Sequence, residues 1–200
     1  MEYKFKNKKI LLKLSKKVFI PNLTSNCLIE AIIKKKFKKK LKILDLGCGS
    51  GVVGIFLKKY FKNNVDIYMS DYSIDAVKLA KENIKLNKVD ATIIKSNVLK
   101  QWKNQKFDII VDDISAINSK IATKIWYNKH IPHKCGDSGI KLSLEVIKNS
   151  KKYLKKNGKL IIPCISISDH KRLMMELKKS FKSVNLLVSK EWPAPKELLQ

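Results

Sequence analysis

A glycine-rich loop between an apolar segment and a helical pattern is the feature that most constrains this sequence. The run LDLGCGSG occupies residues 44–51, and the apolar pattern of a helix begins directly after it at Val52. Glycines in such a loop let the backbone turn tightly and let a ligand approach it closely. The run therefore predicts a strand, a ligand-binding turn and a helix in immediate succession.

Strand and helix patterns alternate along the rest of the chain. This alternation predicts an α/β fold with a doubly wound parallel sheet, in which ligands bind at the carboxyl ends of the strands. The predicted strands are Lys42–Leu46, Val65–Met69, Ala91–Ile94, Phe107–Val111, Lys159–Ile165 and Ser183–Ser189. The predicted helices are Val52–Phe61, Ser73–Leu86, Leu142–Leu154 (closed by Asn157-Gly158) and His170–Phe181.

A lysine-dense stretch at residues 34–40 marks the one change of composition along the chain. Apolar residues between Leu28 and Phe37 follow a helical period, and Thr24 or Ser25 is the predicted N-cap. We therefore expect residues 1–40 to form an N-terminal segment that packs on the core and residues 41–200 to form one globular unit. Proline-containing residues 192–195 exclude a central strand at the chain's end, so either the sheet has six strands or residues 10–14 cover one of its edges.

Two kinds of ligand compete for the glycine loop. Residues 49–54 formally match the dinucleotide pattern G-x-G-x-x-G, and Asp71 follows Gly51 where a ribose-binding acid belongs. The alternative is S-adenosylmethionine, which carries an ammonium and a sulfonium group but no phosphate. Asp45, at the tip of the strand, favours S-adenosylmethionine over a dinucleotide, because a fixed carboxylate repels a pyrophosphate and attracts a cation.

In these residues the chain resembles the class I S-adenosylmethionine-dependent methyltransferases, over most of its length. The resemblance implies a Rossmann-like, mostly parallel sheet of six or seven strands flanked by helices. It also implies that Asp71 binds both ribose hydroxyls, that Tyr72 packs near the adenine, and that the amide oxygen of Asn97 accepts from the adenine amino group. The residues that it assigns to the cofactor are Asp45, Gly47, Cys48, Gly49, Gly51, Asp71, Tyr72 and Asn97.

Two further stretches resemble the HemK-type glutamine methyltransferases and the related small-domain RNA methyltransferases. Residues 18–25 (VFIPNLTS) resemble the segment that precedes the domain and folds over the cofactor. Residues 135–140 (CGDSGI) resemble a G-G-x-D-G stretch between the fourth and fifth strands of that branch. Its Asn-Pro-Pro-Tyr motif is missing, because residues 113–116 read DISA. This departure argues against a release-factor glutamine, or an exocyclic base amine held in the same way, as the acceptor.

Asp113 is the candidate catalytic residue on the acceptor side, with Asp112 behind it. A carboxylate there can accept a hydrogen bond from a substrate N–H or O–H and take its proton during methyl transfer. Alternatively, either aspartate caps the following helix. We favour an amine or hydroxyl of a small molecule or peptide side chain as the acceptor. RNA and a protein glutamine amide are the alternatives, and a binding module without turnover is a different class.

The segment of residues 126–135 combines two aromatic side chains with His130, His133 and Cys135. It is read as a lid over the substrate, with Trp126 and Tyr127 as apolar walls, or as ordinary loop packing. Three donors so close together make a weak metal site, so no metal is predicted.

The charge and the cysteines limit the partners and the compartment. The net charge is +26, which favours polyanions, but Arg172 is the only arginine among the 43 basic residues, and base and phosphate recognition favour arginine. The lysines are therefore read mainly as a solvated surface. No apolar run reaches the about 20 residues that span a bilayer, and no secretory signal is evident. The four cysteines form no C-x-x-C pair, which favours a reducing, cytoplasmic location.

Overall fold

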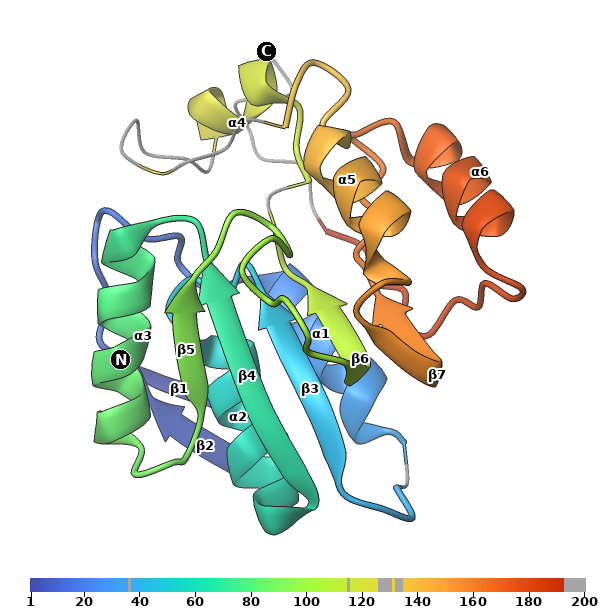
Figure 1. The fold of residues 1–200 in the computed structure, drawn as a ribbon. Coiled ribbons are helices and arrows are strands. Elements are labelled where there is room, and N and C mark those ends of the chain that lie inside the picture. Colours follow the sequence, from blue (N-terminus) through green and yellow to red (C-terminus); the bar gives the residue numbers. More distant parts are fainter. Residues whose placement is uncertain (36, 115, 126–130, 132–134, 193–200) are drawn as a thin grey trace.

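The chain folds around a parallel β-sheet whose strands follow the order β5-β4-β3-β6-β7 (Figure 1). The computed structural model describes residues 1–35, 37–114, 116–125, 131 and 135–192. All four neighbouring pairs in this sheet are parallel. Its strands are β3 (Leu41–Leu46), β4 (Val65–Asp71), β5 (Thr92–Lys95), β6 (Phe107–Asp112) and β7 (Leu154–Ile161). The sheet is the predicted α/β, Rossmann-like, doubly wound one, with five strands in the described residues rather than six or seven.

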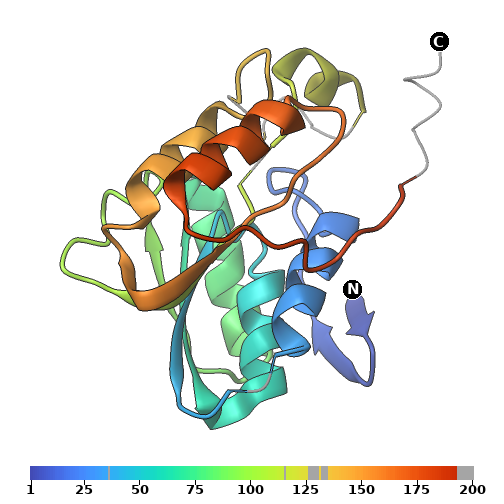
Figure 2. The ribbon, with the colours of Figure 1, turned by 90° about the vertical axis from the view of Figure 1, so that its right-hand side faces the viewer.

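Helices cover both faces of the sheet. The helical elements are α1 (Leu23–Ile33), α2 (Val52–Phe61), η1 (Lys62–Asn64), α3 (Ile74–Leu86), α4 (Ser119–Ile125), α5 (Lys141–Ser150) and α6 (His170–Ser180). Figure 2 shows α5 and α6 on the side of the sheet opposite to α1 and α2. Ile43 and Ile67 pack toward α1 and α2, whereas Leu44 and Ile110 pack toward α5. This alternation is the two-residue period of strands that are buried on both faces.

The N-terminal residues form a hairpin that packs beside α2. Strands β1 (Glu2–Phe5) and β2 (Lys8–Leu11) pair only with each other in the described residues, so β2 covers no edge of the large sheet. Tyr3 and Ile10 join the same buried cluster as Phe56 of α2. Helix α1 begins earlier than predicted, and its N-cap is Asn22 rather than Thr24 or Ser25, because the Asn22 side chain accepts from the Thr24 N–H.

The boundary between α5 and β7 was predicted wrongly. Helix α5 ends at Ser150, and β7 begins at Leu154, where the sequence pattern predicted that the helix would continue. Asn157 has a φ of +66°, and the register between β6 and β7 shifts at this point. Asn-Gly therefore forms an irregularity within a strand instead of closing a helix, because the same dipeptide suits a bulge and a helix end.

The predicted last strand, Ser183–Ser189, is not formed. Residues 181–192 are described and carry no strand assignment, and the side chain of Leu186 is 84% exposed. Figure 2 shows this segment leading from α6 toward α1, where Lys190 lies 4.0 Å from Glu30. An alternating pattern becomes a strand only when a neighbouring strand offers its backbone groups. This segment instead leads toward helix α1, which offers none.

None of the described helices has the length and apolar character that crossing a bilayer requires.

Candidate functional site

A cavity of about 360 Å³ lies at the carboxyl ends of β3, β4, β5 and β6. Strands β3 and β6 are neighbours although they are far apart in the chain, so the strand order reverses between them. Ligands of doubly wound sheets bind at such a switch point. The wall of the cavity comes from the loops after these four strands and from N-terminal residues between Lys17 and Ser25, as the sequence predicted for this edge of the sheet.

The glycine loop forms the floor of the cavity and is held by the end of β4. The N–H groups of Gly47 and Cys48 both donate to the carbonyl oxygen of Ser70, at 2.8 and 3.0 Å. The N–H of Gly51 donates to the carbonyl oxygen of Cys48 at 2.7 Å, which closes the turn before α2 begins. The loop is therefore a rigid surface rather than a loose connection.

The three loop glycines assigned to the cofactor differ in what surrounds them. Gly47 and Gly49 line the cavity, as does Cys48, whereas Gly51 does not. A Cβ on Gly51 would lie 2.7 Å from the Met69 side chain, so this glycine is required for packing between α2 and the sheet. The prediction that Gly51 touches the cofactor remains untested, and its placement favours an indirect role.

Asp45 lies beneath the glycine loop, on the α2 face of the sheet. It is fully buried and does not line the cavity. Its Oδ2 accepts a hydrogen bond from the Gly54 N–H at 2.8 Å, in the first turn of α2, where a carboxylate also interacts favourably with the helix dipole. Its Oδ1 has no partner among the described residues, which leaves one acidic oxygen unsatisfied below the loop.

Asp71, at the end of β4, joins the glycine loop to the start of α3. Its Oδ2 accepts from the Gly49 N–H at 2.9 Å, and its Oδ1 accepts from the Ser73 N–H at 2.8 Å. Asp71, Tyr72 and Asn97 all line the cavity, and the side chain of Tyr72 is 61% exposed. The sequence-predicted residues after β4 and β5 are thus brought together on one side of the cavity.

Asp113 lies on the opposite side of the cavity, directly after β6. Its N–H donates to the carbonyl oxygen of Leu46, which ties this loop to β3. The hydroxyl of Ser25, from α1, donates to Asp113 Oδ2 at 3.1 Å. Among the described residues Ser25 is the one donor to this carboxyl group, and Asp113 lines the cavity. Asp113 does not cap a helix, because α4 begins only at Ser119.

Asp112 points away from the cavity, toward the α5 face of the sheet. It is fully buried, and its Oδ1 accepts from the Ile114 N–H at 3.2 Å, while its Oδ2 has no partner among the described residues. The geometry therefore favours a role for Asp112 in holding the turn after β6, and its predicted catalytic role remains untested.

Burial makes all four aspartates around this end of the sheet hard to ionise. It raises the pKa of Asp45 and of Asp112 to about 7 in each case, although backbone N–H groups act in the opposite direction. Burial also raises the pKa of Asp71, and burial together with the nearby Asp45 raises that of Asp113 well above its usual range. A cation bound in the cavity would therefore favour the ionised forms of Asp71 and Asp113, which line it.

The cations of this basic protein are nearly absent from the cavity. Lys17 is the one basic side chain among the described residues that line it. The remaining wall on the Asp113 side is largely apolar and includes Ile114, Ile117 and Leu142. Within the described residues, the cavity of this strongly basic chain is thus lined by two acidic side chains, Asp71 and Asp113, and by one basic side chain.

Contact between Ser25 and Asp113 was not predicted from the sequence. The two residues are 88 positions apart, and serine and aspartate are individually common in loops and caps, so no local signal joins them. The resemblance of residues 18–25 to a cofactor-covering segment was the one available sign, and these residues do lie along the cavity.

The segment proposed as a lid falls largely outside the described residues. Trp126, Tyr127, His130 and His133 are not described, so the lid remains a prediction. Ile131 lines the cavity and Cys135 is buried. The described residues contain no group of three or more metal-ligating side chains placed to hold an ion.

Comparison with known proteins gives this site a family context. Residues 20–113 match a family model described as "Methyltransferase small domain". A release factor glutamine methyltransferase from Borreliella burgdorferi is 35% identical over 159 residues, which is 74% of this chain and 54% of that protein. A ribosomal protein L11 methyltransferase from Acetivibrio thermocellus is 29% identical over 166 residues, which is 82% of this chain and 44% of that protein.

The fold has a counterpart among solved structures. A 16S rRNA methyltransferase from T. thermophilus, in complex with AdoMet and guanosine, shares the fold with a TM-score of 0.71. The similarity covers 96% of this chain and 47% of that one, at 16% sequence identity. The chain spans about half the length of the curated relatives named above.

These matches and the shared fold support the predicted resemblance to the class I S-adenosylmethionine-dependent methyltransferases. The matched segment of this chain is a methyltransferase small domain, and its homologues include the HemK-type glutamine methyltransferases.

Proposed function

We propose that this protein is an S-adenosylmethionine-dependent methyltransferase that binds its cofactor in the cavity above the glycine loop. One observation carries the proposal: a single cavity joins the glycine loop and Asp71 on one side to Asp113 on the other. The first group suits a nucleoside with a charged tail, and the second suits an acceptor. A methyltransferase needs both to meet in one place, because methyl transfer depends mainly on alignment of donor and acceptor.

The charge of the cavity fits S-adenosylmethionine better than a dinucleotide. Asp71 and Asp113 face the cavity, and the unpartnered Oδ1 of Asp45 lies beneath its floor. A pyrophosphate would meet these carboxyl groups with repulsion, whereas an ammonium and a sulfonium would be attracted by them. When bound, the cofactor supplies an electrophilic methyl group on a positively charged sulfur.

The residues that would hold the cofactor divide between two sides of the cavity. Asp71 would accept hydrogen bonds from the ribose hydroxyls, because each carboxylate oxygen can accept more than the one backbone N–H that it already has. Tyr72 and Asn97 would lie near the adenine. Gly47, Cys48 and Gly49 would contact the methionine part, with Asp45 contributing charge from below.

On the acceptor side we propose an amine or hydroxyl of a small molecule or peptide side chain. Asp113 Oδ1 would accept the N–H or O–H of the nucleophile and take its proton as the new bond to the methyl carbon forms. The electron pair of the broken C–S bond stays on sulfur. The raised pKa makes the ionised form of Asp113 a stronger base than an ordinary aspartate, and a sulfonium in the cavity would favour that ionised form.

The relatives leave several acceptors to be weighed. Their names cite a release factor glutamine, a ribosomal protein and an rRNA. A carboxamide acceptor needs both a donor and an acceptor from the protein, and Asp113 in the ionised form that proton transfer requires can only accept. This favours an amine or hydroxyl over a glutamine amide. RNA is the second candidate, supported by the resemblance to small-domain RNA methyltransferases and by the charge of +26. It predicts binding to bulk tRNA that weakens steeply with salt.

Binding of S-adenosylhomocysteine, followed by calorimetry, tests the cofactor assignment. We expect the wild type to bind it in preference to NAD and Asp71→Asn to bind it at least about tenfold more weakly, because a charged hydrogen-bond acceptor is lost. Asp66→Asn is the matched control, since Asp66 lies on the same strand at the opposite end of the sheet and pairs with Lys40. Preference for NAD, or equal affinity of both variants, would reject the assignment.

The acceptor class is tested with S-adenosylmethionine that carries a tritiated methyl group and with fractionated cell extract. We expect label in small molecules or peptides. We also expect loss of transfer in Asp113→Asn, with unchanged affinity for S-adenosylhomocysteine, which carries no sulfonium. Label in RNA alone would replace the favoured acceptor by the second candidate. Cofactor binding without transfer to any fraction would indicate a binding module.

A further inference from the structure

An N-terminal arm, defined here as residues 11–22, runs from the hairpin along α3 and then over the glycine loop. Lys17, Val18 and Phe19 of this arm line the cavity. A Cβ built on Gly49 would lie 3.9 Å from Val18 Cγ1 and 4.0 Å from the Phe19 carbonyl oxygen, so the arm touches the loop at its centre. The arm and the loop therefore form two facing walls of one site.

Asn83, a fully buried residue of α3, connects these two walls. Its Oδ1 accepts from the Lys13 N–H at 2.7 Å, and its Nδ2 donates to the Lys13 carbonyl oxygen at 3.2 Å. The same Nδ2 donates to the carbonyl oxygen of Ser50, in the glycine loop, at 2.9 Å. The Asn83 amide thus pairs with both backbone groups of Lys13, as a neighbouring strand would, and its Nδ2 group also donates to the glycine loop.

Asn87 lies one helical turn later and makes the same kind of contact with the arm only. Its Oδ1 accepts from the Leu11 N–H at 3.0 Å, and its Nδ2 donates to the Leu11 carbonyl oxygen at 2.6 Å. Its other hydrogen goes to the carbonyl oxygen of Asn83, within α3, at 2.8 Å. Asn87 is therefore a natural control, because it fixes the arm without touching the glycine loop.

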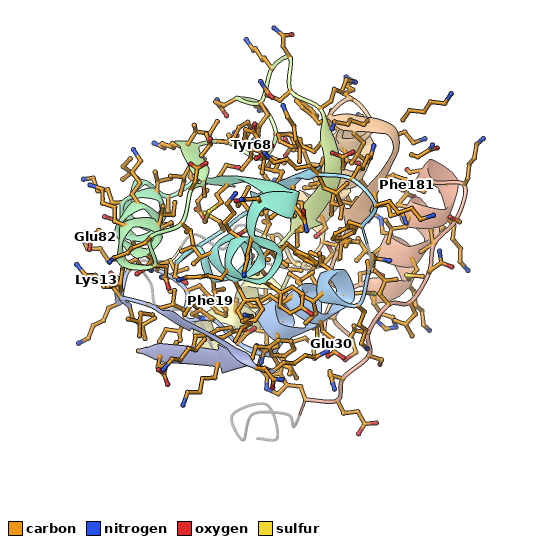
Figure 3. All side chains as sticks on the ribbon, turned by 90° about the horizontal axis from the view of Figure 1, so that it is seen from below. Lys13, Phe19, Glu30, Tyr68, Glu82 and Phe181 are labelled. Carbon is orange, nitrogen blue, oxygen red and sulfur yellow. The ribbon has the colours of Figure 1, made fainter. Side chains whose placement is uncertain are left out.

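A further contact joins the arm to α3 at the surface. Lys13 Nζ lies 2.9 Å from Glu82 Oε2, and Figure 3 shows the two side chains next to each other at the edge of the molecule. Both side chains are more than half exposed, so this pair adds little to the stability of the contact. Besides the buried side chains of Leu12 and Val18, the attachment of the arm therefore depends on the hydrogen bonds of the two asparagines.

We propose that Asn83 is a positioning residue that couples the N-terminal arm to the glycine loop. Binding of the cofactor on the loop then stabilises the arm over the cavity, and an attached arm strengthens binding of the cofactor by the same factor. This inference rests on the proposed function, because the ligand that benefits is the cofactor.

The variants Asn83→Ala and Asn87→Ala separate coupling from mere attachment of the arm. We expect Asn83→Ala to weaken S-adenosylhomocysteine binding by about five- to tenfold, because the loop loses a buried hydrogen bond that fixes Ser50. Both variants should be less stable to urea, but Asn87→Ala should change the affinity for S-adenosylhomocysteine less than about twofold. Equal losses of affinity in the two variants, or none in Asn83→Ala, would overturn the proposal. Asn83→Ser serves if the alanine variant does not fold.

Amide hydrogen exchange of the wild type provides a second test that needs no variant. Saturation with S-adenosylhomocysteine should slow exchange of the Lys13 N–H, which is bonded to Asn83, more than that of the Leu11 N–H, which is bonded to Asn87. Equal slowing at both, or none at Lys13, would contradict the coupling. A wild type that does not bind S-adenosylhomocysteine at all would instead reject the proposed function, so the two failures are distinguishable.

Discussion

Replacement of Gly47 by alanine should destabilise the protein more than the same replacement of Gly49. Both glycines lie in the same loop, line the same cavity and have a positive φ, of +76° and +52° respectively. A Cβ on Gly47 would lie 2.9 Å from the backbone N and Cα of Ile114, whereas a Cβ on Gly49 meets nothing closer than 3.9 Å. The pair therefore differs mainly in the collision with the loop after β6.

The magnitudes follow from these distances. An alanine in the left-handed region costs roughly 1–2 kcal/mol at either position. The collision at Gly47 adds about 1–3 kcal/mol, because a backbone segment rather than a flexible side-chain end must move. We therefore expect Gly49→Ala to lose about 1–2 kcal/mol of the free energy of unfolding and Gly47→Ala to lose about 2–5 kcal/mol.

Urea unfolding followed by circular dichroism measures this difference. With a slope of about 2 kcal/mol per molar urea, the midpoint of Gly47→Ala should lie roughly 0.5–1.5 M below that of Gly49→Ala. The slopes should agree, which would show that both variants unfold from comparably compact states. Equal midpoints would refute the reasoning, since they would mean that the loop carrying Asp113 and Ile114 moves aside without cost.

Three further predictions concern the buried polar groups. Folding raises the pKa of the Asp112 carboxyl from 3.8 to about 7, so the wild type loses free energy of unfolding as the pH rises through that range. Asp112→Asn lacks this carboxyl, so its free energy of unfolding should fall less than that of the wild type between pH 4 and pH 8. Parallel stability–pH curves would contradict this. Trp102→Phe should cost about 1 kcal/mol in thermal or urea unfolding, since the indole N–H donates to the Ser70 hydroxyl inside the core; an unchanged midpoint would argue that this hydrogen bond is dispensable. Ser25→Ala should lower kcat several-fold and leave the affinity for S-adenosylhomocysteine unchanged. The acidic limb of the pH–rate profile should move to higher pH, because the Ser25 hydroxyl lowers the pKa of Asp113. An unmoved profile would show that Asp113 takes no part in the rate-limiting proton transfer.

Much of the fold could be predicted because its signals are local. Helix α2 has the predicted bounds Val52–Phe61, and α3 begins directly after Ser73, the first residue of its predicted range, whose side chain accepts from the Ala76 N–H. Apolar periodicity and capping residues act within a few positions, so the sequence alone displays them. The prediction of a strand at Ser183–Ser189 was wrong because a strand depends on a partner strand, which can lie anywhere in the chain and leaves no local signal.

The candidate site divides in the same way. The sequence by itself determined the glycine loop, the acid at the end of the second strand of the βαβ unit and the edge of the sheet on which they meet, because strand direction and glycine placement are local properties. Tertiary structure alone decided that Asp45 and Asp112 point away from the cavity, and that Ser25 reaches Asp113. It also decided that Asn83 joins Lys13 to Ser50. Each of these contacts joins residues from separate elements, and only the packing of helices on a twisted sheet determines which polar atoms meet.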